Sequence, residues 1–495
     1  MMKHKNIYLV LVLLLIFGSS CDDKFAEINK NPNAVTEIDD GYLFSNTVLS
    51  TIRGGNNTRL QFPFGSQLGH YYVGQNNAMF IDRYYDYFTG AEYKDLFQDF
   101  YYGPIRLVTE VMRFTRPGGE RENEVRFAMA QVVAFMNYAR LADTFGSVPY
   151  IEGGLGQEGF LFPKYNSVEF IYTDMMERLK TIIPLLQNAD PAMGYTQEDP
   201  LYNNDLKKWA RFANSLRLRF AMRARFVAPE LANPIIAECL ALPLIEELNQ
   251  AAGGENEDSD LNELGNPMYS HYQYWKWKMS EKFVETLKTT DDPRLYLFVK
   301  PNRKGEYVGI PNGLSDQELP KWVWSDVSDP SDTLVGRAAS ISEMTAAEIW
   351  LLRAEAALYN LGPGDANELY RKGIEMSFEQ WKVTQEQIYE YMTNADYSTL
   401  KGTQEQKFEQ ICTQLWIAVH SNSHEGWANI RRTGYPRIPQ RTEPTHSLGV
   451  TNGVLPTRLR YPSSEVNINR ENYEAAIAEQ GPDLITTHLW WDVRD

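Results

Sequence analysis

Hydrophobic residues recur at intervals of three and four along most of this chain, and this periodicity constrains the fold more than any other feature. Residues 125–142 carry it at five positions: Val125, Met129, Val132, Met136 and Ala139. Residues 205–227 and 346–361 repeat the pattern. Because this spacing places apolar side chains on one face of an α-helix, the sequence predicts a mostly α protein.

The predicted helices are arranged in pairs. Trp350 and Ala354 lie in one helical segment, which a Gly362-Pro363-Gly364 break separates from a second, as in a tetratricopeptide helix pair. The expected pairs are 92–114 with 125–144, 168–187 with 205–227, 346–361 with 365–381, and 404–432 with 467–480. Their spacing is irregular, so we expect irregular tetratricopeptide-like pairs rather than a regular solenoid.

A segment of different composition interrupts the helices between about residues 251 and 340. It is rich in Gly, Pro, Asn and Asp, and contains short β-strand candidates such as residues 295–299. The sequence therefore predicts a helical scaffold over about 92–250 and 341–480, with a loop-rich excursion over about 251–340.

The N-terminus has the features of an export signal. Lys3 and Lys5 precede an apolar run from Ile7 to Phe17, which is too short to span a bilayer but suits a signal peptide. Small residues and then Cys21 follow, in the arrangement of a bacterial lipobox. We expect residues 1–20 to be a lipoprotein signal peptide, Cys21 to be the lipid-attachment residue, and residues 21–495 to form a single domain.

Composition excludes several classes of protein. The chain has a formal net charge of −17, which argues against nucleic acid as a partner because phosphate binding depends on clustered Lys and Arg. A hydrophobic fraction of 43% excludes a disordered chain. The other two cysteines, Cys239 and Cys412, lie in apolar helical stretches, so we expect buried free thiols.

Three sequence patterns bear on nucleotide binding, metal binding or catalysis, and each lacks a feature that such a site needs. Residues 154–159 match a dinucleotide-binding glycine pattern, but an extended segment ending in Pro163 follows instead of a helix. His420 and His424 have helical metal-ligand spacing without an evident third ligand. No carboxylate pair stands out for glycosidase chemistry. We predict no catalytic residues, no metal, no cofactor and no enzymatic activity.

Seven short motifs together resemble the SusD/RagB family of outer-membrane lipoproteins, and most closely its branch with the Arg431-Arg432-Thr433-Gly434-Tyr435-Pro436 pattern. The others are Asn29–Asn33, Ala142–Tyr150, Trp209–Arg219, Asp292–Leu295, Arg460–Glu465 and Trp490–Asp492. The resemblance implies a SusD-like scaffold in a lipid-anchored cell-surface protein of the outer membrane. It also implies a subunit that captures a glycan and delivers it to a SusC-like TonB-dependent transporter.

Clusters of aromatic residues are the candidate ligand-binding residues. A sugar ring has an apolar face that stacks on an aromatic ring and a rim of hydroxyl groups that form hydrogen bonds. The chain contains 29 Tyr and 11 Trp, several of them in loop-like segments. The predicted contact residues are Tyr84, Tyr87, Tyr269, Tyr274, Trp275, Trp277 and Trp322. We expect Trp275 or Trp277 to stack on a sugar, with Tyr84 or Tyr87 closing the same shallow site.

The family motifs do not include these aromatic residues, so the resemblance assigns none of them a role. Two alternatives to glycan capture remain open at this stage. The same scaffold binds peptides in RagB-type relatives, and a surface glycoside hydrolase is the less favoured alternative.

Overall fold

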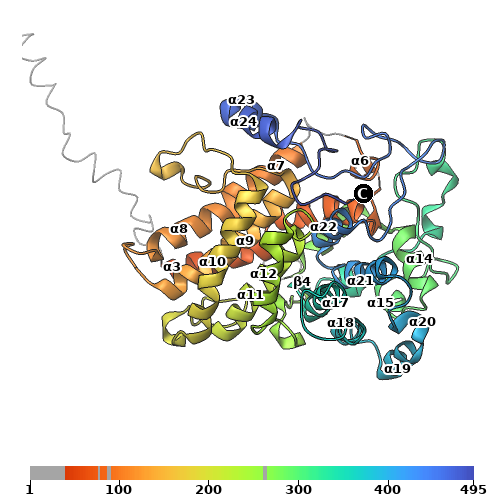
Figure 1. Cartoon of the computed structure of the whole chain (residues 1–495). Helices are drawn as coiled ribbons and strands as arrows, with labels where there is room; N and C mark the ends of the chain where they lie inside the picture. The colour runs from red at the N-terminus through yellow and green to blue at the C-terminus, as the bar shows by residue number, and fades with distance from the viewer. Residues whose placement is uncertain (1–38, 76–78, 86–90, 260–264, 495) are drawn as a thin grey trace, which may run out of the picture. The chain divides into compact units, whose positions relative to one another are not determined.

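The computed structural model describes residues 39–75, 79–85, 91–259 and 265–494. The larger of two compact units contains all of the described residues from Asp40 onward. The larger unit is mostly α-helical, which confirms the predicted fold class (Figure 1). Among the described residues, no helix has the length and apolar composition needed to cross a membrane.

The helices before the middle segment are α3 (Asp40–Arg53), α4 (Gly55–Arg59), α5 (Ser66–Leu68), α6 (Met79–Asp82), α7 (Ala91–Phe100), α8 (Arg106–Thr115), α9 (Glu124–Phe145), α10 (Val168–Asn188), α11 (Leu206–Ala224) and α12 (Pro229–Leu240). Those from the middle segment onward are α13 (Pro267–Trp275), α14 (Glu281–Thr289), α15 (Leu295–Phe298), α16 (Asp332–Val335), α17 (Ala346–Leu358), α18 (Ala366–Gln380), α19 (Gln385–Thr393), α20 (Ala395–Ser398), α21 (Gln404–Ala418), α22 (Ser423–Thr433), α23 (Ser463–Ile468) and α24 (Arg470–Gln480).

Within the described parts of the chain, four short strands form two antiparallel pairs. They are β1 (Tyr72–Val73), β2 (Ala252–Gly254), β3 (Lys278–Met279) and β4 (Ile341–Met344). Strand β1 pairs with β3, and β2 pairs with β4. Both pairs therefore tie the middle segment to other parts of the chain: β3 joins it to β1 before the scaffold helices, and β2 joins it to β4 just before α17.

Three of the four predicted helix pairs are present. Helix α10 packs on α11, α17 on α18, and α8 on α9. The fourth prediction is wrong, because residues 404–432 are two helices, α21 and α22, which pack on each other. Helix α21 also packs on α17, whereas α24 packs on its neighbour α23.

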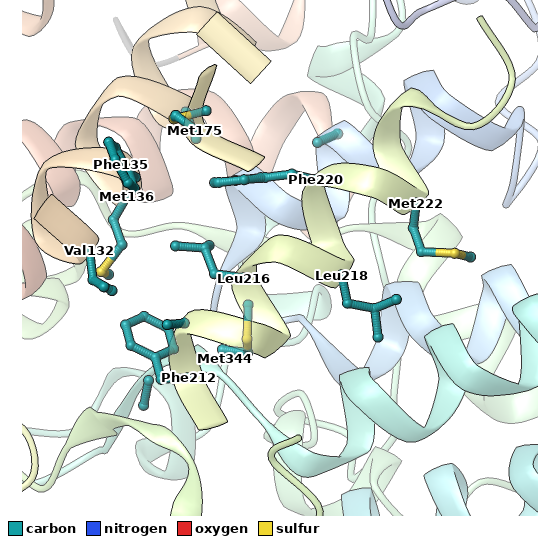
Figure 2. Packing of buried hydrophobic residues seen from close by; sticks show 14 of the residues in the cluster. Val132, Phe135, Met136, Met175, Phe212, Leu216, Leu218, Phe220, Met222 and Met344 are labelled. Atoms are coloured by element: carbon teal, nitrogen blue, oxygen red, sulfur yellow. The ribbon is translucent and has the colours of Figure 1, made fainter. Parts of the chain in front are cut away.

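The largest hydrophobic cluster of the described residues extends over many helices, and α9, α10 and α11 contribute a large part of it. Figure 2 shows Phe135 and Met136 of α9 near Leu216 and Phe220 of α11, with Met175 of α10 above them. Helix α11 begins after Asp205, whose side chain accepts hydrogen bonds from the backbone N–H groups of Lys207 and Lys208. The apolar periodicity and this N-cap together explain why the helix forms here.

Helix α11 also carries buried arginines that are paired with acids on neighbouring helices. Arg219 binds Glu348 of α17 at 2.6 Å, and Arg223 binds Asp143 of α9 at 2.8 Å and also Glu425 of α22. Pairing of this kind offsets the large cost of removing charges from water. The basic face of residues 207–225 is therefore largely occupied by scaffold ion pairs.

The arginines at the end of α22 belong to the same scaffold. Arg432 and Arg225 both bind the fully buried carboxylate of Glu355 on α17. Burial opposes ionisation of Glu355, but the guanidinium groups of Arg432 and Arg225 hold its pKa below the usual value. Arg431 lies with its guanidinium group 3.6 Å from the centroid of the Trp427 ring.

The middle segment is more helical than its composition predicted. It contains α13, α14, α15 and α16 in addition to its loops. Most of the strand predicted at 295–299 instead forms α15, because the backbone carbonyl of Asp292 accepts the Leu295 N–H and starts a helical turn; only Val299 is extended, in a bridge with Pro330. The two internal thiols, Cys239 and Cys412, are free and buried, as expected.

Candidate functional site

The predicted aromatic cluster at residues 269–277 lies on α13 and in the turn after it, not in a loop. The side chain of Asn266 accepts a hydrogen bond from the Met268 N–H, and Pro267 occupies the first helical turn. Lys276 ends the helix in a left-handed conformation, with a φ of 50°. These capping residues make a helix of a segment that its Gly and Pro content had suggested was irregular.

The helix turns the Tyr274 ring toward solvent and packs part of the Trp275 ring against a hydrophobic cluster that includes Phe62 and Trp277. The Tyr274 side chain is 78% exposed, and Trp275 is half-buried beside it. Their ring centroids lie 4.8 Å apart with an interplanar angle of 84°, an edge-to-face arrangement. Tyr269, also half-buried, lies with its ring centroid 5.2 Å from the guanidinium carbon of Arg337. Helix α13 therefore presents aromatic surface that a ligand can reach.

Trp277 is a core residue, which corrects the expectation of a surface ring at this position. Its side chain is 0% exposed and meets Phe62 edge-on, with ring centroids 4.8 Å apart. The reason lies in the turn at Lys276, after which the chain enters β3 and pairs with β1. Without exposed surface, the Trp277 ring is not available for stacking on a ligand.

The same correction applies to Tyr84. Its ring is 1% exposed and lies under the guanidinium group of Arg441, whose central carbon is 3.5 Å from the ring centroid. Burial raises the pKa of the Tyr84 hydroxyl to about 12, against the opposing effect of Arg441. Tyr84 thus stabilises the segment that carries it. Tyr87, the other predicted residue of this cluster, lies outside the described residues.

Trp322 occupies an intermediate position. It is half-buried and packs against a small hydrophobic cluster formed by Val73, Ile310, Leu314 and Val327. One part of its ring therefore contributes to packing, and the remainder reaches solvent.

The structure reveals a cavity that the sequence did not predict. It has a volume of about 400 Å³ and is open to solvent. Its lining consists of Tyr85, Ser315, Asp316, Gln317, Glu443, Pro444, His446, Ser447, Leu448 and Gly449. It therefore combines one aromatic ring with hydroxyl, amide and carboxylate groups.

Two loops form this cavity and are held to each other by backbone hydrogen bonds. The Ser315 N–H donates to the Thr445 carbonyl at 3.1 Å, and the Ser447 N–H donates to the Gly313 carbonyl at 2.8 Å. Gly449 has a φ of 57°, and a Cβ there would lie 2.3 Å from the Tyr84 carbonyl oxygen. The close approach therefore requires glycine.

Several polar and charged groups around the cavity bind one another. Arg83 pairs with Asp316 at 2.7 Å, and the Ser447 hydroxyl lies 3.3 Å from the Tyr85 hydroxyl. Burial and the nearby Arg441 lower the pKa of His446, so this imidazole is neutral near pH 7. The cavity can thus form hydrogen bonds with an uncharged polyhydroxylated ligand. None of its lining residues belongs to α13.

The described residues contain no group of three His, Cys, Asp or Glu side chains arranged to hold a metal ion. His420 and His424, which have metal-ligand spacing, are both buried. His420 lies among aromatic rings, including Tyr71 and Phe283, and burial lowers its pKa to about 3. These histidines are packing residues of the scaffold.

Comparison with known proteins identifies the family. Residues 32–462 match the SusD-like family described as "Starch-binding associating with outer membrane". The chain belongs to this family. Among curated proteins, none is similar enough in sequence to count as a match.

Several solved structures share the fold. A chitin-binding protein is 25% identical, with a TM-score of 0.80 over 92% of this chain and 100% of that one. A chitin-binding SusD homologue from Flavobacterium johnsoniae is 24% identical, with a TM-score of 0.79 over 92% and 99%. A SusD homologue from Bacteroides uniformis is 24% identical, with a TM-score of 0.77 over 92% and 100%.

Proposed function

We propose that this protein captures oligosaccharides at the cell surface and carries out no chemistry on them. The observation that carries the proposal is the exposed Tyr274–Trp275 ring pair on α13. Rings of this kind give a sugar a flat apolar contact at low cost in conformational entropy. Membership of a starch-binding family and the chitin-binding relatives support a glycan as the ligand.

The predicted contact residues retained in the proposal are Tyr269, Tyr274, Trp275 and Trp322. The cavity beside Tyr85 adds a second contact region, where hydroxyl, amide and carboxylate groups would bind the hydroxyl rim of a sugar. The proposed ligand is uncharged, because the described residues that line the cavity include the acids Asp316 and Glu443 and no basic side chain other than His446, and Asp316 is already paired with Arg83.

The proposed location is the outer membrane, with the protein lipid-anchored through Cys21 on the cell surface. The family's association with the outer membrane supports this location, and the lipobox pattern before Cys21 supports the anchor. Cys21→Ala should leave the protein soluble or uncleaved, because the acyl chains that hold a lipoprotein in the membrane would be lost. Complete partitioning of this variant with outer membranes in cells without the transporter would contradict the anchor.

The proposed partner is a SusC-like TonB-dependent transporter, to which the captured glycan would be delivered. We expect a stable complex that buries well over roughly 1,600 Å². Mild-detergent purification from native membranes tests this, and recovery of the protein without a β-barrel partner would contradict it.

One experiment distinguishes oligosaccharide capture from peptide binding and from glycoside hydrolysis. Calorimetry would compare chito- and malto-oligosaccharides with neutral and charged peptides, and chromatography of the same mixtures would detect released products. We expect saturable oligosaccharide binding, no product, and loss of binding in the Tyr274→Ala/Trp275→Ala double variant. Salt-dependent peptide binding would instead favour the peptide hypothesis, and product release would favour the hydrolase.

A control variant is available on another part of the surface. Tyr389 on α19 is 71% exposed, comparable to Tyr274. Tyr389→Ala should bind oligosaccharides as the wild type does. An equal loss of affinity in both variants would show that the loss is not specific to α13.

A further inference from the structure

A second ring pair, formed by the exposed Tyr296 and the half-buried Tyr307, lies on the middle segment, outside all of the predicted contact residues. Tyr296 of α15 is 59% exposed, and its ring meets that of Tyr307 edge-to-face with centroids 5.3 Å apart. The geometry resembles that of Tyr274 and Trp275, whose centroids are 4.8 Å apart at a similar angle. Both pairs expose aromatic rather than aliphatic surface, which suits a flat sugar face.

Helix α16 connects the two ring pairs, since it packs against both α13 and α15. Asp329, three residues before α16, links them further. Burial and the nearby Asp329 carboxylate raise the pKa of the Tyr272 hydroxyl of α13, and the Asp329 backbone carbonyl accepts the Lys300 N–H at 2.8 Å. Lys300 follows α15 closely and also pairs with Asp332 of α16 at 2.8 Å.

Polar groups border the second pair. Arg303 and Lys304, which precede Tyr307, both pair with Asp326, and the lysine contact measures 3.0 Å. The Arg303 and Lys304 side chains are each more than half exposed. They can exchange partners with ligand hydroxyl groups at little cost, because exposed ion pairs contribute little to stability.

We infer that the Tyr296–Tyr307 pair is a second anchoring point for the same glycan chain that stacks on Tyr274 and Trp275. This inference rests on the proposed function and adds the ligand class: an extended oligosaccharide of several sugar units. Because α16 packs against both helices, at most two helix-to-helix spacings, roughly 16–20 Å, separate α13 from α15. In this proposal a chain of several sugar units spans both pairs, whereas a disaccharide occupies only one of them.

Two anchoring points on one chain produce a dependence of affinity on chain length. Once the first ring pair holds a long oligosaccharide, binding at the second is intramolecular and is favoured by the high local concentration. A short oligosaccharide occupies one pair only and gains nothing from the other.

The test is calorimetry with chito- and malto-oligosaccharides of two and six sugar units. Wild type should bind the hexasaccharide of its preferred series more tightly than the disaccharide. Tyr296→Ala should weaken hexasaccharide binding about tenfold and leave disaccharide binding unchanged. Tyr296→Leu, which retains apolar bulk without a flat ring, should behave in the same way and serves if the alanine variant folds poorly. Tyr389→Ala is the matched control.

The outcomes distinguish this inference from the function on which it rests. Unchanged hexasaccharide affinity in both Tyr296 variants, with binding by wild type intact, would overturn the second anchoring point alone. Equal losses for the short and long ligands would also overturn it, since Tyr296 would then belong to a single site. Absence of oligosaccharide binding by the wild type would overturn the proposed function itself.

Discussion

The helical scaffold and the aromatic surface of the middle segment use the same kinds of residue in opposite ways. In the scaffold, Arg432 and Glu355 are fully enclosed and bind each other. On the middle segment, Arg303 and Asp326 pair at a solvent-exposed edge. The tryptophans differ similarly, because Trp277 is enclosed by core residues whereas Trp275, two positions earlier, reaches solvent.

This difference separates stability from recognition. A buried ion pair or ring is fixed by its neighbours, so its loss destabilises the fold. An exposed ring contributes little to the fold and remains available for a ligand. Substitutions in the two regions should therefore affect different measurements.

The largest effect is expected at Glu355. Glu355→Ala would leave the guanidinium groups of Arg225 and Arg432 buried without their carboxylate partner. We expect the free energy of unfolding to fall by about 3–5 kcal/mol in denaturant titrations. Glu474→Ala, which removes an exposed partner of Arg470, is the control and should cause only a small change. Similar losses in both variants would contradict the distinction between buried and exposed pairs.

Trp277→Ala should have a comparable effect on stability. Truncating a fully buried tryptophan removes its contacts with Phe62 and leaves a cavity, at a cost of about 3–5 kcal/mol. Thermal and denaturant unfolding measure this loss. If the variant retained wild-type stability but lost oligosaccharide affinity, Trp277 would be a contact residue and its assignment to the core would be wrong.

The contribution of Glu355 to the free energy of unfolding should also depend on pH. The pKa of Glu355 is lower in the folded protein than its ordinary value of 4.5, so its ion pairs stabilise the fold above that pH. As the pH falls below 4.5 toward the folded-state pKa, this contribution is lost. The difference in unfolding free energy between wild type and Glu355→Gln should therefore shrink from pH 7 to pH 3. A constant difference would show that the charge of Glu355 is not the stabilising feature.

The smallest effect is expected at the cavity. Tyr85→Phe removes one hydroxyl group near Ser447 and retains the ring. Oligosaccharide affinity should fall by roughly 0.5–1.5 kcal/mol, or about two- to tenfold, with no change in melting temperature. If the Tyr85→Phe and Tyr85→Ala variants both bound oligosaccharides with wild-type affinity, the cavity would not be part of the binding surface.

The scaffold could be predicted because its signals are local and repeated. The spacing of Val125, Met129 and Val132 defines a buried helix face whatever the partner helix is. The prediction of the fourth helix pair was wrong because it treats residues 404–432 as one helix. The chain ends one helix at Ala418 and begins another at Ser423, and no Gly or Pro marks this break in the sequence.

The binding surface was harder to predict because exposure depends on tertiary contacts. Trp275 and Trp277 have the same residue type and nearly the same position, and only the left-handed turn at Lys276 separates their environments. The cavity requires Tyr85 and two loops, 315–317 and 443–449, which are more than one hundred residues apart in the chain, to meet. One sequence feature is consistent with the cavity: segment 434–456 contains Pro and Gly and lacks helical periodicity, which is typical of a loop.

The most direct test of the account is a paired measurement on Trp275→Ala, of oligosaccharide affinity by calorimetry and of melting temperature on the same sample. Removal of a stacked aromatic side chain costs about 2 kcal/mol, so the account predicts about a thirtyfold loss of affinity. The melting temperature should fall less than in Trp277→Ala, because only part of the Trp275 ring packs against the neighbouring hydrophobic cluster. Wild-type affinity in this variant, or a large fall in melting temperature, would contradict the claim that α13 presents the glycan-binding surface.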